Sequence, residues 1–173
     1  LKKFFQIGSG LEYKDTKKLH SEKDQLKPKG FYGLAKKKAS LYCLKSTRDN
    51  DFPATILRLY QIYGPSQDFN RLIPKAIFSL KKNQLFESSH GEQFRDFLFI
   101  DDLIDVFLKL IHTRKKIKGE IFNIGTGKPI KVKKVLQLVQ KRIKKGKILF
   151  GALKLRRDEP MNLVPQTQCG VHL

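Results

Sequence analysis

The chain has 173 residues, 36 of them Lys or Arg and 16 Asp or Glu, which gives a formal net charge of +20. A hydrophobic content of 40% supports a packed core and argues against a disordered chain. No apolar run reaches the roughly 20 residues that a membrane-spanning helix needs. The two cysteines have no metal-ligand spacing. We therefore expect a cytoplasmic protein of one domain, or one and a part, with no metal and no membrane partner.

Apolar runs and turn residues alternate in the order typical of a parallel α/β sheet. We expect a short, buried strand at 3–8, a polar and turn-rich stretch at 11–29, and a long helix from about 32 to 45. A second apolar run at 53–59 has the length and composition of a strand, and a Gly-Pro turn follows it. Strand, helix and strand in this rhythm predict a parallel pair with a right-handed crossover.

The second half continues the alternation. The expected elements are an amphipathic helix at 71–82, a short strand at 84–87, an extended segment at 94–100, a helix at 102–113 and a third strand at 120–125. Asp101 is expected to cap the helix that follows it. Its neighbours Asp102 and Asp105 are better explained by the helix macrodipole than by acid–base chemistry.

The densest positive charge lies at 131–147, which holds eight basic residues and no acid. Apolar residues recur there at helical spacing, so the lysines would form the outer face of a helix. A solvated face is the simplest interpretation, and steering of an anionic substrate is a second. Nucleic-acid binding would require exposed aromatic residues or a recognition module among the charges. We therefore expect no nucleic-acid partner.

Tyr32 and Lys36 are the strongest candidates for chemistry. Residues four apart lie on the same face of a helix, so the ammonium group would lie beside the phenol. A neighbouring positive charge favours the phenolate, the form in which tyrosine acts as a base. Tyr13 and Lys17 have the same spacing but no helical pattern around them. A tyrosine on an ordinary helix remains the structural alternative for Tyr32.

The first strand ends at Gly8-Ser9-Gly10, which places a serine hydroxyl at the carboxyl edge of the expected sheet. Open α/β sheets bind their ligands at this edge. The two glycines do not form a dinucleotide fingerprint, because Tyr13 occupies the place of the third glycine.

Five motifs occur in one order along the chain. They are Gly-Ser-Gly-Leu-Glu-Tyr at 8–13, Tyr32-x-x-x-Lys36, Leu-Arg-Leu-Tyr-Gln-Ile-Tyr-Gly-Pro at 57–65, Gly-Glu-Gln-Phe-Arg-Asp-Phe-Leu-Phe-Ile-Asp-Asp at 91–102 and Phe-Asn-Ile-Gly-Thr-Gly at 122–127. Together they resemble the NAD-dependent epimerase/dehydratase family, the extended short-chain dehydrogenases that act on nucleotide sugars. The resemblance extends to about Met161.

The resemblance implies an α/β fold with two parts. Residues 1–65 and 94–126 would form the C-terminal part of a Rossmann-like, doubly wound parallel sheet. Residues 66–93 and 127–173 would form an incomplete, smaller substrate-binding subdomain.

The resemblance also implies roles for eight residues. Tyr32 would be the catalytic base, Lys36 would support it and hold the nicotinamide ribose, and Ser9 would hydrogen-bond the reacting sugar hydroxyl. The other expected contacts are Leu59 and Tyr60 with an NAD or NADP cofactor, and Gln61, Arg95 and Arg156 with a nucleotide-diphosphate sugar.

The sequence departs from the family pattern at several points. Gln61 stands where many relatives have an asparagine, and the Asp-Glu pair of sugar 4,6-dehydratases is absent after Ser9. These departures favour an epimerase or a 4-keto reductase over a dehydratase. The glycine-rich turn that opens the family's fold has no counterpart. We expect a fragment of an enzyme that is a homodimer when complete, with the isolated chain inactive. The alternative is a catalytically inactive, dehydrogenase-like binding module.

Overall fold

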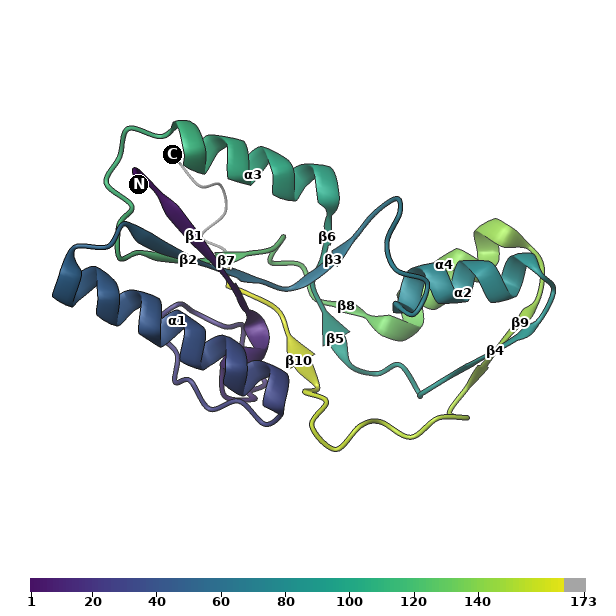
Figure 1. Ribbon diagram of the computed structural model, residues 1–173. Helices are drawn as coiled ribbons and strands as arrows, with labels where there is room; N and C mark the ends of the chain where they lie inside the picture. The colour runs from purple at the N-terminus through teal and green to yellow at the C-terminus, as the bar shows by residue number, and fades with distance from the viewer. Residues whose placement is uncertain (167–173) are drawn as a thin grey trace.

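Three parallel strands form the central sheet of the computed structural model, which describes residues 1–166 (Figure 1). They are β1 (Phe4–Ser9), β2 (Ala54–Leu59) and β7 (Ile121–Ile124), in the order β1-β2-β7. The register pairs Ser9 with Leu59, so the carboxyl ends of the strands meet at one edge of the sheet. This edge is the one at which parallel sheets bind ligands.

Helices cover both faces of this sheet, as Figure 1 shows. They are α1 (Phe31–Asn50) and α3 (Ile100–His112). Successive side chains of a strand point to opposite faces. In β2, Leu57 therefore packs into the cluster beneath α3, whereas Ile56 packs with Cys43 of α1. The structure confirms the doubly wound α/β arrangement.

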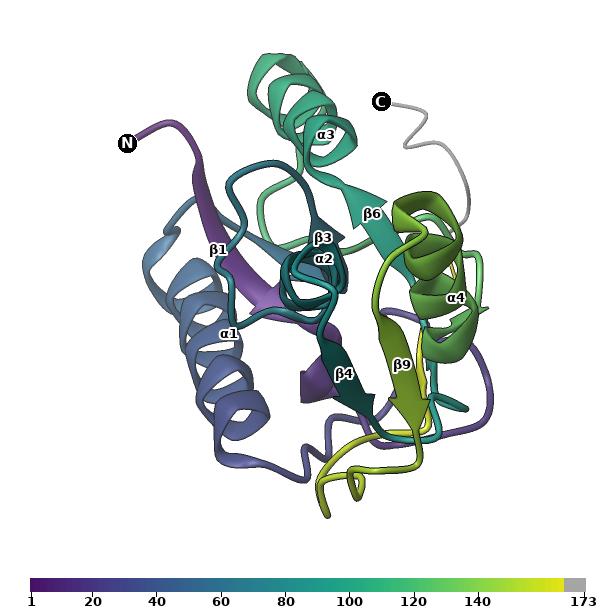
Figure 2. The ribbon, with the colours of Figure 1, turned by 90° about the vertical axis from the view of Figure 1, so that its right-hand side faces the viewer.

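A smaller lobe lies beside the central sheet in Figure 1 and faces the viewer in Figure 2. It contains α2 (Leu72–Lys81), β4 (Leu85–Ser88), α4 (Val132–Ile143) and β9 (Lys147–Phe150). The two strands pair in parallel and the two helices pack against each other. Their shared core consists of Ala76, Leu80, Phe86, Val132, Leu136 and Ile148.

Short strands connect the lobe to the central sheet. One parallel pair is β3 (Gln61–Tyr63) with β6 (Phe97–Phe99). The other small sheet has β5 (Phe94–Arg95) between β8 (Ile130–Lys131) and β10 (Asn162–Leu163). An exposed loop leads from β9 to β10. Because β10 pairs with β5, this loop brings the C-terminal segment back to the middle of the molecule.

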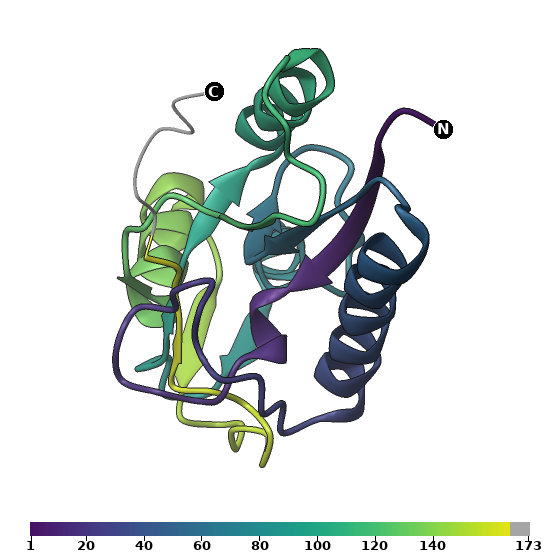
Figure 3. The same ribbon diagram turned by 90° about the vertical axis from the view of Figure 1, so that its left-hand side faces the viewer.

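The polar stretch between β1 and α1 also returns to the centre (Figure 3). It begins with the single turn η1 (Gly10–Glu12). Further along, the backbone amide of His20 donates to the carbonyl of Val164, and the amide of Gln166 donates to the carbonyl of His20. The turn-rich stretch is therefore held in place by the last described residues.

Three local expectations are corrected by the structure. Asp101 is not the N-cap, because α3 begins at Ile100 with Phe99 in the cap position; the carboxylate lies in the first turn, where it still complements the macrodipole. The first strand is half-buried rather than buried over most of its length, because it is an edge of the three-stranded sheet. The basic stretch is not one helix, since α4 ends at Ile143 with Lys144 in the left-handed conformation, and β9 begins at Lys147.

None of the helices within residues 1–166 is long and apolar enough to cross a membrane. Cys43 is buried and reduced, whereas Cys169 and the end of the proposed second part lie outside the described residues.

Candidate active site

A cleft with a volume of about 870 Å³ opens at the carboxyl edge of the central sheet, toward the smaller lobe. It is lined by seven of the eight residues predicted from the sequence, which are Ser9, Tyr32, Leu59, Tyr60, Gln61, Arg95 and Arg156. They come from β1, α1, β2, β3, β5 and the loop before β10, with Tyr60 between β2 and β3, so only the fold brings them together.

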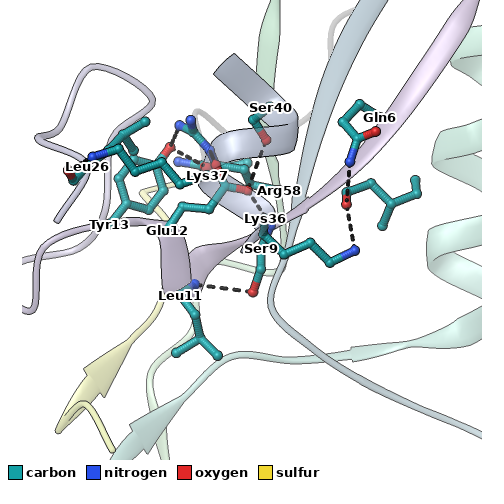
Figure 4. Close-up of polar contacts among 12 residues, drawn as sticks. Gln6, Ser9, Leu11, Glu12, Tyr13, Leu26, Lys36, Lys37, Ser40 and Arg58 are labelled. Atoms are coloured by element: carbon teal, nitrogen blue, oxygen red, sulfur yellow. Dashed lines mark hydrogen bonds and ion pairs between the residues drawn. The ribbon is translucent and has the colours of Figure 1, made fainter. Parts of the chain in front are cut away.

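Tyr32 and Lys36 lie side by side near the start of α1. The Tyr32 side chain is 59% exposed and lines the cleft. The Lys36 ammonium lies 5.7 Å from the centroid of the Tyr32 ring and donates a hydrogen bond of 2.9 Å to the carbonyl of Ile7 (Figure 4). The contact with β1 fixes the ammonium beside the phenol, which is the arrangement that the helical spacing predicts.

Ser9 is held in a capping box where β1 becomes η1. Its Oγ accepts a hydrogen bond from the amide of Leu11 at 3.2 Å, and its own amide donates to Oε1 of Glu12 at 2.9 Å. A hydroxyl that accepts one bond can still donate its proton. Ser9 is therefore a fixed hydroxyl donor on the wall of the cleft.

Next to Ser9 lies a buried ion pair that the sequence analysis missed (Figure 4). Oε2 of Glu12 is 3.0 Å from Nε of Arg58, and its Oε1 also accepts from the Ser40 hydroxyl at 3.1 Å. One pair thus ties η1 to β2 and α1. A signal was present, because Arg58 is the single charged residue in a strand that is otherwise apolar except for Thr55. A buried charge requires a partner of opposite sign.

Tyr13 belongs to the same buried network. Its hydroxyl accepts from Nη1 of Arg58 at 2.6 Å and donates to Oδ1 of Asn123 at 2.8 Å. Burial raises the pKa of Tyr13, and the positive charge of Arg58 offsets only part of this effect. Tyr13 is a neutral structural phenol, which agrees with the choice of Tyr32 as the candidate base. No helix joins Tyr13 to Lys17.

Two further aromatic residues fill the space below the Ser9 turn. The His20 ring lies 5.0 Å from that of Tyr13 and 6.1 Å from that of Tyr60. Burial lowers the pKa of His20 and raises that of Tyr60 well above its usual value, so both are neutral. A Cβ on Gly10 would lie 2.6 Å from the Tyr60 ring, so only glycine allows this close approach. The Tyr60 side chain therefore packs under the cleft floor.

Arg95 and Gln61 enter the cleft from the short strands. Arg95 is 5% exposed, and its guanidinium donates to the carbonyl of Phe94 at 2.6 Å and pairs with the carboxylate of Glu159. Gln61 is half-buried, and its backbone amide donates a hydrogen bond of 3.0 Å to the carbonyl of Asp96. Arg156 is exposed in the turn that also carries Glu159.

Within 1–166, no three His, Cys, Asp or Glu side chains gather closely enough to hold a metal ion. The polar groups that the predicted residues bring to the cleft include a phenol, a hydroxyl and two guanidinium groups.

Comparison with known proteins decides the family. A profile of the NAD dependent epimerase/dehydratase family matches residues 1–125, well over half of the chain. The chain belongs to this family. The match covers β1, α1, β2 and β7, so it includes the edge that carries Ser9 and Tyr32.

Individual members of the NAD dependent epimerase/dehydratase family agree with this assignment. CDP-abequose synthase of Salmonella muenchen is 33% identical over 106 residues, which are 61% of this chain and 36% of that protein. Human dTDP-D-glucose 4,6-dehydratase is 30% identical over 148 residues, which are 81% of this chain and 41% of that protein. The chain thus spans about two fifths of the length of these relatives.

The structural comparison gives the same result. A UDP-glucuronic acid 4-epimerase from Bacillus cereus, solved with UDP-glucuronic acid and NAD, superposes with a TM-score of 0.88 at 27% identity. The match covers 94% of this chain and 52% of that one. A dTDP-glucose 4,6-dehydratase from Bacillus anthracis shares the fold with a TM-score of 0.84 at 21% identity.

Proposed function

We propose that this chain is the catalytic and substrate-binding part of a nucleotide-sugar epimerase or 4-keto reductase. The observation that carries the proposal is the cleft, because hydroxyl groups from β1 and α1 and two guanidinium groups line the same space. A sugar with a nucleotide diphosphate needs both kinds of group, one for its reacting hydroxyl and one for its phosphates. Family membership supports the same class of substrate.

NAD or NADP is the proposed cofactor, and the described residues fit its nicotinamide end. Tyr32 leaves open space beside it, and the Lys36 ammonium uses one of its three donors on Ile7. Both lie at the carboxyl edge of the parallel strands, where such folds bind nucleotides. When bound, the cofactor supplies hydride transfer to and from a sugar carbon.

The residues of the chain would transfer the proton and orient the sugar. Tyr32, as the phenolate, takes the proton of the reacting sugar hydroxyl, and the Lys36 ammonium stabilises that phenolate. Ser9 donates its hydroxyl hydrogen to the same sugar oxygen and so orients it. After the hydride returns, Tyr32 gives the proton back. The product would be an epimer if the hydride supplied by the cofactor entered the opposite face of the carbon.

The remaining candidates would hold the ends of the ligands. Arg95 and Arg156 offer planar guanidinium groups that suit the paired oxygens of a diphosphate. Gln61 would contact the substrate from β3. Leu59 and the backbone of Tyr60 would border the cofactor at the end of β2.

The two-part division forms part of the proposal. Residues 1–65 and 94–126 would carry the catalytic edge, and residues 66–93 and 127–173 would cover the substrate. The complete protein would be a cytoplasmic homodimer.

The experiment is a turnover assay of the Tyr32→Phe variant in a protein that carries a glycine-rich NAD-binding unit ahead of this chain. We expect turnover to fall by about 10²–10⁴-fold, the range for loss of a general base, while nucleotide-sugar binding stays within about twofold of the parent. The matched control is Tyr42→Phe, an exposed tyrosine on the same helix, which should leave turnover unchanged. Equal turnover of the Tyr32→Phe variant and the parent would refute the proposal.

A further inference from the structure

The partner of Arg95 in the free protein is itself an anion. We propose that Glu159 is a specificity-determining residue of the cleft, which occupies Arg95 until an anionic ligand displaces it. Only a ligand with more negative charge than one carboxylate then binds well. The inference rests on the proposed function, because it concerns the same phosphate site, and it names the class of ligand that the site selects.

The contact is a direct ion pair inside the cleft. Nη2 of Arg95 pairs with Oε1 of Glu159, while Nη1 donates to the carbonyl of Phe94. Within residues 1–166, Glu159 is the one acidic side chain that forms an ion pair with Arg95. Both side chains line the cleft. A ligand that enters the cleft therefore meets a guanidinium that is already neutralised.

The backbone around Glu159 allows the side chain to leave without unfolding. Just after it, β10 is fastened to β5, since the amide of Phe94 donates to the carbonyl of Met161 at 2.8 Å. Just before it, residues 151–158 are exposed and contain no helix or strand. The Glu159 side chain is 27% exposed, so a rotation about its own bonds is enough to bring the carboxylate into water.

The same turn joins the two proposed phosphate ligands. The amide of Glu159 donates to the carbonyl of Arg156 at 3.1 Å, which closes a turn with Arg156 at one end and Glu159 at the other. Asp158, between them, packs against the start of α1, because a Cβ on Gly30 would lie 2.5 Å from its Oδ2. Figure 1 shows this yellow segment running from β9 toward the first turn of α1. The turn thus contacts Arg95 through Glu159 and the start of the Tyr32 helix through Asp158.

The charge of a ligand determines whether it can replace the Glu159 carboxylate at Arg95. A carboxylate that replaces Glu159 leaves the charge around Arg95 unchanged, so the exchange gains little. A diphosphate brings at least two negative charges and can contact Arg95 and Arg156 together, with charge-assisted hydrogen bonds to both. A repulsive element that disfavours the wrong ligand is a usual source of specificity. Glu159 is that element here.

The test measures binding of inorganic pyrophosphate to the 173-residue chain by calorimetry at fixed ionic strength. Pyrophosphate has no ribose or base, so it reports on the phosphate site alone. Glu159→Gln keeps the size of the side chain and removes its charge. We expect pyrophosphate to bind about tenfold more tightly to this variant, the scale of one charge-assisted contact.

Asp158→Asn is the matched control. It removes one negative charge from the residue next to Glu159, and the Asp158 carboxylate does not pair with Arg95. Its affinity should stay within about twofold of the parent. In the Arg95→Ala background, Glu159→Gln should no longer tighten binding. Unchanged or weaker binding by Glu159→Gln alone overturns the inference. Unchanged binding by Arg95→Ala overturns the proposed phosphate site itself, so the two failures are distinguishable.

Discussion

Glu12 and Arg58 form an ion pair in which both side chains are buried, with Oε2 of Glu12 3.0 Å from Nε of Arg58. The pair lies next to the turn that presents Ser9, and Oε1 of Glu12 accepts a hydrogen bond from the backbone amide of Ser9. The position of a candidate catalytic hydroxyl therefore depends on a buried charge pair.

Glu12→Gln should destabilise the chain strongly. Glutamine keeps the shape of the side chain, but it leaves the buried guanidinium of Arg58 without a compensating charge. Breaking a buried pair in this way costs about 3–5 kcal/mol of unfolding free energy. Urea unfolding followed by circular dichroism measures the change. Asp15→Asn, which breaks the partly exposed pair with Lys29, should cost less than about 1 kcal/mol. Equal effects of the two variants would show that the buried pair is not special.

Stability should fall as the pH falls, because of His20. Burial lowers the pKa of His20 in the folded state, and the carboxylates of Asp24 and Asp15 offset only part of this effect. The unfolded state, with a pKa of about 6.5, then binds the proton more readily. The contribution is fully present above about pH 6.5 and is lost as the pH falls from there through the folded pKa.

The measurement is the urea midpoint at several pH values between about 7.5 and 5, the interval that contains the unfolded pKa. His20→Phe should flatten the dependence, because phenylalanine cannot take up the proton. His112→Gln, which changes an exposed histidine on α3, should leave the slope as it is. A slope that survives in His20→Phe would assign the dependence to another group.

Tyr13→Phe should affect stability rather than chemistry. The variant loses a hydroxyl that joins Arg58 to Asn123 and leaves both partners short of a hydrogen bond. Loss of one partner in a buried hydrogen bond costs about 1–3 kcal/mol. Thermal unfolding measures the effect, with Tyr42→Phe as the exposed control. A neutral Tyr13→Phe variant would mean that the network does not support the fold.

Gly33→Ala should disturb the packing of α1 on η1. A Cβ at this position would collide with the backbone carbonyl of Leu11, which cannot move independently of the Ser9 turn. We expect a loss of about 1–3 kcal/mol from overpacking, in spite of the better helix propensity of alanine. Lys38→Ala on the exposed side of the same helix is the control. Urea unfolding compares the two, and a stabilised Gly33→Ala variant would contradict the expected collision.

Arg95→Lys should restore only part of what Arg95→Ala loses. In the complete enzyme, alanine should lower kcat/KM for the nucleotide sugar. The loss of transition-state stabilisation should be about 2–3 kcal/mol, the range for hydrogen bonds to a charged group. Lysine keeps the charge but lacks the planar fork that matches a phosphate. If both variants match the parent enzyme, the diphosphate must be held elsewhere in the cleft.

The sequence by itself determined the elements and the family. Apolar runs and periodicity predict β2, α2 and β7 because they report which residues of each element are buried, and burial follows a local repeat. The Tyr32 and Lys36 pair was also predictable, since a helix places residues four apart together whatever surrounds it. The ordered motifs then identified the family that the comparison confirms.

Only the tertiary structure decided which charges neutralise each other. Glu12 and Arg58 are 46 residues apart and Arg95 and Glu159 are 64 apart, so no local spacing connects them. Likewise, Lys36 donates its hydrogen bond to the carbonyl of Ile7, which is 29 residues away in the sequence. These contacts arise where strands and loops from distant parts of the chain meet at one edge of the sheet. Because a buried charge takes whichever partner the packing brings near, its partner is determined by the fold and not by the residues beside it.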